Sequence, residues 1–91
     1  MGDVMPLSQV LKYEDEMKKQ GVSEVARSSR GFLGNYKKYK TFANMKNKNP
    51  PNENITWEAK RRAFIKRHLA QYRQNPTERR RLALIAWAFM P

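Results

Sequence analysis

The chain has 91 residues, enough for one small hydrophobic core and too few for two, so we expect residues 1–91 to form a single domain. It has no cysteine, which excludes disulfides and thiolate metal sites. The 19 Lys and Arg against 8 Asp and Glu give a net charge of +11. This charge favours a polyanionic partner, which is nucleic acid or an acidic membrane or protein surface.

The first third of the chain is electrically neutral. Residues 1–30 hold five basic and five acidic side chains, so the whole cationic excess lies after Arg30. A weakly amphipathic stretch from Ser8 predicts a helix that ends at Gly21, and Ser23 is placed to cap a second short helix. The N-terminus lacks the basic flank and long apolar run of a secretory signal, and no apolar run is long enough to span a membrane. We therefore expect an intracellular protein with no membrane segment.

Residues 21–36 match two nucleic-acid-binding patterns, both poorly. Their Gly-Val-Ser-x-Val-Ala start is typical of a degenerate helix-turn-helix, but Phe32 and Leu33 stand where that motif needs polar groups to read bases. The spacing of Gly31 and Gly34 also fits the loop of KH domains, although no strands are predicted around it. Neither match supports a functional prediction.

Aromatic residues and lysines alternate in residues 36–42. Rings that stack on unpaired bases, with lysines along the backbone, would form a platform for single-stranded nucleic acid. A helix is expected from Phe32 to about Phe42, and the helical spacing of Tyr36, Tyr39 and Phe42 favours the other interpretation, in which the rings pack inward and the lysines face solvent. The lysines of this segment are Lys37, Lys38 and Lys40.

A polar, flexible loop is expected at residues 44–54, which are mostly Asn, Lys and Pro without apolar periodicity. Thr56 is placed to cap the longest predicted helix, residues 57–74, which carries an apolar stripe. Arg61 lies inside that stripe, where its side chain could extend past the neighbouring rings to solvent or meet a partner carboxylate. The stripe consists of Trp57, Phe64, Ile65, His68, Leu69 and Tyr72.

The last part of the chain joins three arginines to an apolar run. Asn75, Pro76 and Glu78 are placed as N-cap, first helical residue and capping-box partner, so we expect a helix over about residues 76–90. Its residues 82–90 would be apolar all round the axis, so this helix must be buried on every side. It is either the central helix of its own domain, packed against the long helix, or a docking element that a partner or a second copy covers.

The pattern predicts an all-α fold, a small bundle of about four helices, because neither a strand pattern nor a repeat is present. Residues 55–91 would form a basic helical hairpin on which nine cations converge. Seven of them are arginines, whose planar forks suit phosphate.

We therefore predict a protein that binds the phosphate backbone of DNA or RNA with little sequence preference. The predicted contacts are Lys60, Arg62, Lys66, Arg67, Arg73, Arg79, Arg80 and Arg81, together with Lys37, Lys38 and Lys40. The alternative is a structural or interaction protein, such as a minor virion or complex subunit, that docks through the apolar run from Leu82 to Met90.

No catalytic residue, metal site or cofactor is predicted. His68, the one histidine, lies in an apolar stripe without a cysteine or a well-placed carboxylate, which is typical of a residue at the core edge. Glu14, Asp15 and Glu16 are consecutive, so they point in different directions on a helix and form no carboxylate pair. These acidic residues suit a role in neutralising part of the basic hairpin, and we do not expect an enzyme.

A pattern of three stretches extends over most of the chain outside the Asn-rich loop: VARSSRGFL at 25–33, FIKRHLAQ at 64–71 and RRLALIAWAFMP at 80–91. Together they resemble a family of small, basic, uncharacterised helical proteins encoded by bacteriophages and large DNA viruses of aquatic hosts. The resemblance implies a viral origin and three candidate roles: a virion component, a genome-associated protein or a factor acting on host nucleic acid. The expected place is the host cytoplasm, the nucleoid or nucleus, or the virion. The resemblance implies no activity and no functional residues.

Overall fold

In residues 4–91, which the computed structural model describes, seven helices are joined by turns and no strand is present. The all-α prediction is confirmed, with more and shorter helices than expected. The helices are α1 (Leu7–Leu11), α2 (Glu14–Gln20), α3 (Glu24–Arg27), α4 (Phe32–Tyr39), α5 (Phe42–Met45), α6 (Trp57–Gln74) and α7 (Glu78–Ile85).

Local backbone geometry explains the extra helices. The helix expected before Gly21 is divided at Lys12 and Tyr13, while Gly21 ends α2 in the left-handed region as expected, with φ 64°. The helix expected over residues 32–42 stops at Tyr39, because Lys40 turns left-handed with φ 70°. The side chain of Thr41 then accepts a hydrogen bond from the Asn44 N–H, which starts α5.

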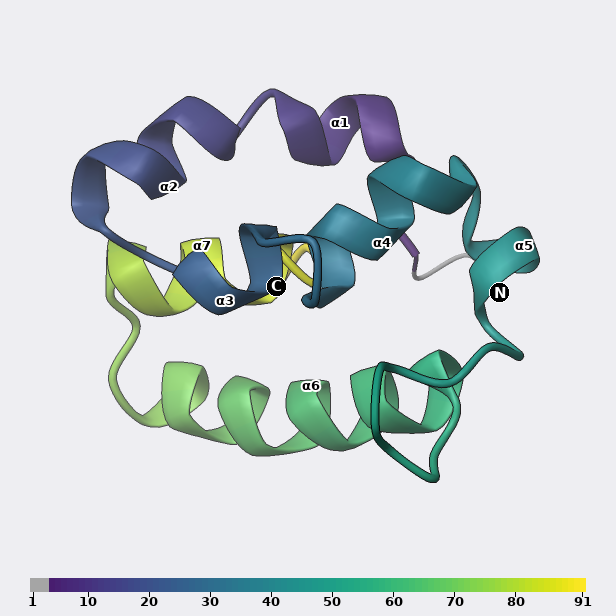
Figure 1. The fold of residues 1–91 in the computed structure, drawn as a ribbon. Coiled ribbons are helices and arrows are strands. Elements are labelled where there is room, and N and C mark those ends of the chain that lie inside the picture. Colours follow the sequence, from purple (N-terminus) through teal and green to yellow (C-terminus); the bar gives the residue numbers. More distant parts are fainter. Residues whose placement is uncertain (1–3) are drawn as a thin grey trace.

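The helices lie in three tiers (Figure 1). α1 and α2 form one outer tier and α6 the other, and α7 lies between them with α3 and α4. α7 packs against both α6 and α2. The C-terminal helix is therefore packed against the long helix, as expected, and it also supports the N-terminal part of the chain.

The ends of α7 differ from the predicted ones. Thr77, and not Asn75, is the N-cap, and its hydroxyl accepts a 3.2 Å hydrogen bond from the Arg80 N–H. Asn75 instead ends α6, where its N–H donates to the Gln71 carbonyl. The helix stops at Ile85, well before residue 90, because Ala88 adopts φ 60° and the chain turns back on the last carbonyls.

The apolar C-terminal run occupies the centre of the core. Leu82, Leu84, Ile85, Ala86 and Ala88 are fully buried. The expected burial on every side fails at the end of the run, where Phe89 is half-buried and Met90 is 42% exposed because the chain leaves the core after Ala88. Burial of this segment within its own chain favours the first of the two alternatives drawn from the sequence, the central helix. In this fold the segment is not a free docking surface.

Four aromatic side chains form the middle of the core. The Trp87 ring stacks on Phe32 and Phe64, with centroids 4.9 and 4.3 Å apart, and lies 6.2 Å from the Trp57 ring. These rings come from α4, α6 and the turn after α7, so one cluster joins three segments that are distant in the sequence. Close aromatic pairs add roughly 0.5–1.5 kcal/mol each to the area that they bury.

Two glycines bring α3 and α4 together. A β-carbon on Gly31 would lie 2.0 Å from the Val25 carbonyl oxygen, and one on Gly34 would lie 1.9 Å from the Ser28 carbonyl oxygen. Only glycine permits such a backbone approach. Since Phe32 is also fully buried, the segment that matched the helix-turn-helix and KH patterns is explained by packing.

Tyr36 ties the N-terminal segment to the core. Its hydroxyl donates a 2.7 Å hydrogen bond to the Met5 carbonyl, and the Met5 N–H donates to the Ala88 carbonyl over 2.8 Å. Tyr36 is buried, while Tyr39 and Phe42 are half-buried against the core. The inward interpretation of the alternating aromatic segment is therefore correct.

The buried phenol predicts a loss of stability at alkaline pH. Burial raises the pKa of Tyr36 from its ordinary value of 10.0, while the positive charge of Arg61 opposes the rise. The folded state thus holds this proton more tightly than the unfolded chain, so the stabilisation is complete below pH 10 and is lost as pH rises through the folded pKa. We expect Tyr36→Phe to cost about 1–2 kcal/mol at pH 7 and less above pH 10. Urea unfolding between pH 7 and 11 measures this difference.

A suitable control is Tyr72→Phe. The Tyr72 hydroxyl makes no hydrogen bond within residues 4–91, so this variant should keep the wild-type pH profile. If the stability of Tyr36→Phe changed with pH in parallel with that of the wild type, the Tyr36 hydroxyl would not be the source of the alkaline loss of stability.

Backbone hydrogen bonds attach the polar loop before α6 to the helix that follows. The Trp57 N–H donates to the Lys48 carbonyl and the Glu58 N–H to the Lys46 carbonyl. The loop was expected at residues 44–54, but Asn44 and Met45 belong to α5, and Met45 is fully buried. Within residues 4–91, no helix has both the length and the apolar character to cross a membrane.

Candidate nucleic-acid interface

The side of α6 that faces away from the core carries four exposed cations. This surface, which we call the α6 outer face, consists of Arg62, Lys66, Arg67 and Arg73. Thr56 caps the helix as expected, its hydroxyl accepting from the Ala59 N–H. The opposite side of α6 is held by Trp57 and Arg61, which are both buried. Packing of one side therefore fixes which cations face solvent.

The geometry of the helix places three of these cations in a line. At 100° per residue, Arg62, Lys66 and Arg73 fall within about 40° of one another, with Arg67 on the flank. At about 1.5 Å rise per residue, the ridge from Arg62 to Arg73 is about 16 Å long. Duplex DNA carries one phosphate per roughly 1.7 Å of axis, so several phosphates lie within that length.

The charge of the α6 outer face is not neutralised locally. In the part of the chain that the structure describes, these four side chains take part in no ion pair and no hydrogen bond. Ala63 and Ala70 are exposed beside them, so small side chains leave the cations accessible. The face is therefore ready to bind phosphates without first breaking other contacts.

Lys60, another predicted contact on α6, is placed differently. It is half-buried, forms an ion pair with Glu53 of the preceding loop and lies over the Trp57 ring. It fixes the loop to the first turn of α6. Phosphate binding by Lys60 would compete with these contacts.

The arginine triplet at the start of α7 makes contacts within the chain. Arg79 donates to the Gln20 carbonyl at the end of α2, and Arg80 donates to the Asn75 carbonyl over 2.9 Å. Arg81 pairs with Glu78 at 3.5 Å and lies over the Tyr13 ring. The triplet therefore connects α7 to its surroundings, and it is less free than the α6 outer face.

The three lysines of the aromatic segment lie away from α6. Lys37 forms a 2.6 Å ion pair with Glu14 of α2, which lies on the other side of α7 from α6 (Figure 1). Lys38 lies over the Tyr39 ring, and Lys40 is exposed at the end of α4. Glu14 was expected to neutralise the basic hairpin, and this expectation was wrong because its partner belongs to α4. The eleven predicted contacts thus do not form one continuous surface.

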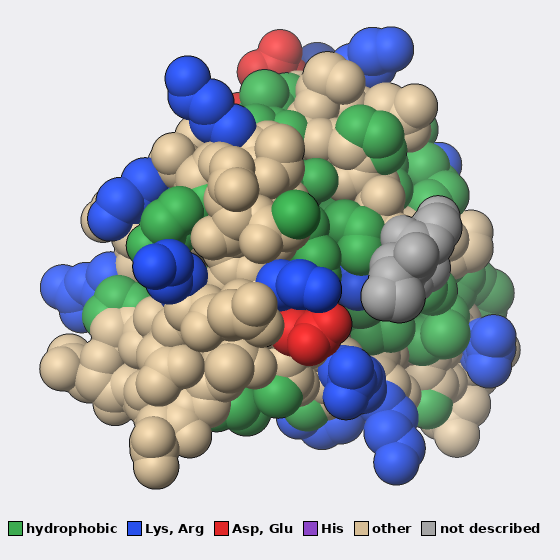
Figure 2. All heavy atoms as spheres, turned by 90° about the vertical axis from the view of Figure 1, so that its right-hand side faces the viewer, with side chains coloured by type: hydrophobic (Ala, Val, Ile, Leu, Met, Phe, Trp, Pro, Cys, Tyr) green, Lys and Arg blue, Asp and Glu red, His purple; other side chains and the backbone are tan. Residues whose placement is uncertain are grey.

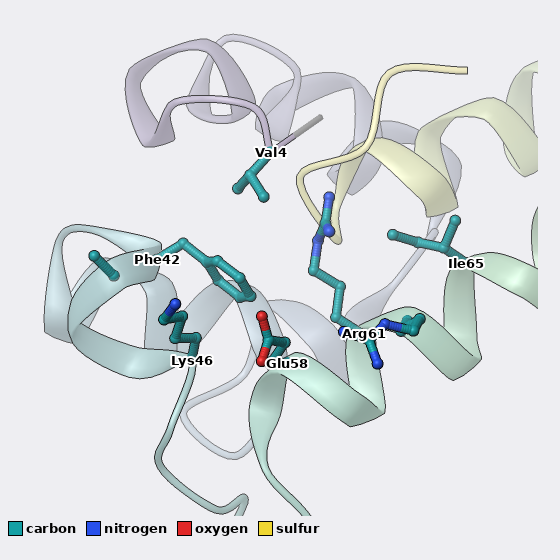
Figure 3. A pocket seen from close by; sticks show the side chains of 8 residues that line it. Val4, Phe42, Lys46, Glu58, Arg61 and Ile65 are labelled. Carbon is teal, nitrogen blue, oxygen red and sulfur yellow. The ribbon is translucent and has the colours of Figure 1, made fainter. Parts of the chain in front are cut away.

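A hollow of about 510 Å³ lies between α5 and the first half of α6. Figure 3 shows Glu58 between Lys46 and Arg61, with Phe42 beside Lys46 and Val4 across the hollow from Glu58. Its apolar lining and its carboxylate suit phosphate less well than the α6 outer face does. Lys46 lines this hollow together with Arg62. Sequence reasoning missed Lys46 because it stands in a run of Asn and Lys that carries no distinguishing signal.

Cations are also found on the molecular surface beyond the α6 outer face. Figure 2 shows Lys and Arg side chains spread over the face that includes α5 and the start of α6, with an acidic group between them near the centre of the view. Within residues 4–91, no group of three or more His, Asp or Glu side chains could hold a metal ion. His68 is half-buried and stacks on the Phe64 ring at 3.8 Å, as expected for a residue at the core edge.

Comparison with protein-family models, with curated proteins and with solved structures gave no match. The functional argument therefore depends on the charge, exposure and contacts of the residues themselves.

Proposed function

We propose that this protein binds nucleic acid through the phosphate backbone, with the α6 outer face as the primary contact surface. The observation that carries the proposal is the presence of four exposed cations on one helix, none of them engaged by another described residue. A net charge of +11 on 91 residues also exceeds what solubility requires. Phosphate contacts of this kind carry no base information, so binding has little sequence preference.

The contact set is narrower than the one expected from the sequence. Arg62, Lys66, Arg67 and Arg73 are the main contacts, and Lys46 lies close enough to the ridge to extend it. Arg79, Arg80 and Arg81 have partners within the chain and contribute less. The rival proposal, docking through residues 82–90, would require the centre of the core to leave the fold.

Salt dependence measures the number of phosphates bound. With four phosphate contacts, a plot of the logarithm of the association constant for a random duplex against the logarithm of the salt concentration should have a slope of about −3.6. Affinity should thus drop roughly 100-fold between about 50 and 200 mM salt. Replacing all four residues of the α6 outer face with Gln should remove most of this slope, as measured by fluorescence anisotropy with a labelled duplex.

A matched control removes the same charge elsewhere. Lys12, Lys18, Lys19 and Arg30 are exposed in the neutral N-terminal third, and their replacement with Gln also lowers the net charge by four. This control should keep most of the slope. Equal losses in the two quadruple variants would show that net charge alone drives binding, and absence of binding at low salt would exclude the proposal.

A further inference from the structure

A second cationic site lies where three distant segments meet, on the flank of α6 that carries Arg67, one turn before Gln71. A hollow of about 200 Å³, which we call the α6–α7 hollow, is lined by the turn after α2, by the second half of α6 and by the start of α7. No Asp or Glu is among the described residues that line it. The lining residues are Gly21, Val22, Ser23, His68, Gln71, Arg79, Arg80 and Ala83.

Both arginines of the hollow are held in place by the fold. Arg79 donates one guanidinium N–H to the Gln20 carbonyl, and Arg80 donates one to the Asn75 carbonyl over 2.9 Å. A guanidinium has five N–H donors, so each arginine keeps most of its donors for a ligand. The contacts that make these arginines poor partners for a long duplex also orient them toward a small anion.

His68 adds a third nitrogen group at a fixed position. Its Nδ1 lies 2.9 Å from the Phe64 carbonyl, and because a carbonyl only accepts, Nδ1 carries the proton. Nε2 then carries the lone pair, so toward a ligand it accepts a hydrogen bond, as from the P–O–H group of a hydrogen phosphate. The imidazole stacks on Phe64, which stacks on Trp87, so the core holds the ring in position.

We propose that the α6–α7 hollow binds a phosphate group. Two guanidinium groups bind paired phosphate oxygens in a bidentate manner, and the Gln71 amide and the Ser23 hydroxyl supply neutral donors beside them. The volume is below the roughly 300 Å³ at which pockets for organic ligands begin, which selects a small anionic group. The group is either inorganic phosphate or the terminal phosphate of a nucleic-acid strand. The site does not require the α6 outer face.

The test is an NMR titration of the full chain with inorganic phosphate, which follows the His68 ring nitrogens and the Arg80 Nε–H. Saturable shifts at both groups are expected, with sodium chloride of equal ionic strength producing none. Gln71→Glu places a carboxylate in the hollow at an exposed position and should weaken phosphate binding about tenfold or more. Gln74→Glu makes the same change outside the hollow and should leave the affinity unchanged.

A second arm identifies the source of the phosphate. A 5′-phosphorylated oligonucleotide is compared with its 5′-hydroxyl counterpart. If the phosphorylated strand binds more tightly, and this difference disappears in Gln71→Glu, the ligand is the terminal phosphate of a strand. Equal binding of both would identify inorganic phosphate. Shifts that do not saturate, or that chloride reproduces, would overturn the proposal. The quadruple Gln variant of the α6 outer face should retain the phosphate titration, so failure of either proposal is visible separately.

Discussion

Replacing Trp87 with alanine should destabilise the protein by about 3–5 kcal/mol, which is the usual cost of removing a large aromatic side chain from a core. The Trp87 ring is 7% exposed and contacts rings from α4 and α6. A domain of this size has a free energy of unfolding of roughly 5–13 kcal/mol, so the substitution should remove a large part of it. Urea unfolding followed by circular dichroism measures the loss.

Two substitutions of exposed apolar residues provide the comparison. Leu11→Ala and Val25→Ala remove side chains that are 39% and 77% exposed, and each should change the free energy of unfolding by less than about 0.5 kcal/mol. A similarly small effect of Trp87→Ala would mean that the C-terminal run is not the centre of the core. Sedimentation of the wild-type chain as an oligomer would then support the docking alternative.

The helical character of the chain and its longest helix could be predicted because their signals are local. Thr56 precedes a stripe with helical period, and the structure begins α6 at Trp57 and ends it at Gln74 as expected. Gly21 likewise ends α2 as predicted. Caps and periodicity depend on residues within one or two turns, so they can be read without knowledge of the rest of the fold.

The ends of α7 could not be predicted in the same way. Asn75 and Thr77 are both good N-cap residues, and the local sequence favoured Asn75 because Pro76 follows it. The choice of Thr77 depends on where α6 ends and how α7 packs on it. The end of α7 at Ile85 depends on Ala88, whose left-handed backbone is unusual for alanine and is fixed by bonds to its carbonyl.

The candidate interface was only partly predictable for the same reason. Periodicity placed Arg62, Lys66 and Arg73 on one side of the helix, and the structure exposes all three. Periodicity alone does not show that Lys60 pairs with Glu53, or that Arg79 donates to a carbonyl at the end of α2. Those contacts join residues from different segments, so they follow from the tertiary arrangement and not from spacing along the chain.

Substitution of Arg61 and Arg62, adjacent on α6, should separate stability from binding. Arg61 is 6% exposed; its Nε donates to the Trp87 carbonyl over 2.8 Å and its Nη2 to the Ala88 carbonyl over 2.9 Å. These charged donors satisfy two carbonyls of the turn that follows α7, close to the C-terminal end of the helix, where positive charge is also favourable. Arg61→Met keeps the apolar stem but leaves the carbonyls short of donors, so it should cost about 3 kcal/mol.

Arg61→Lys should recover part of this loss, because one ammonium group cannot reproduce the two-pronged contact. Arg62→Met is the matched control, since Arg62 is exposed on the α6 outer face. It should leave the free energy of unfolding within about 0.5 kcal/mol of wild type while making the salt slope of duplex binding less negative by about 0.9.

Below its unfolding transition, Arg61→Lys should keep the wild-type slope. A stable Arg61→Met variant would show instead that burying the charge costs as much as its hydrogen bonds contribute. A reduced slope in Arg61→Lys would place the interface on the wrong side of α6.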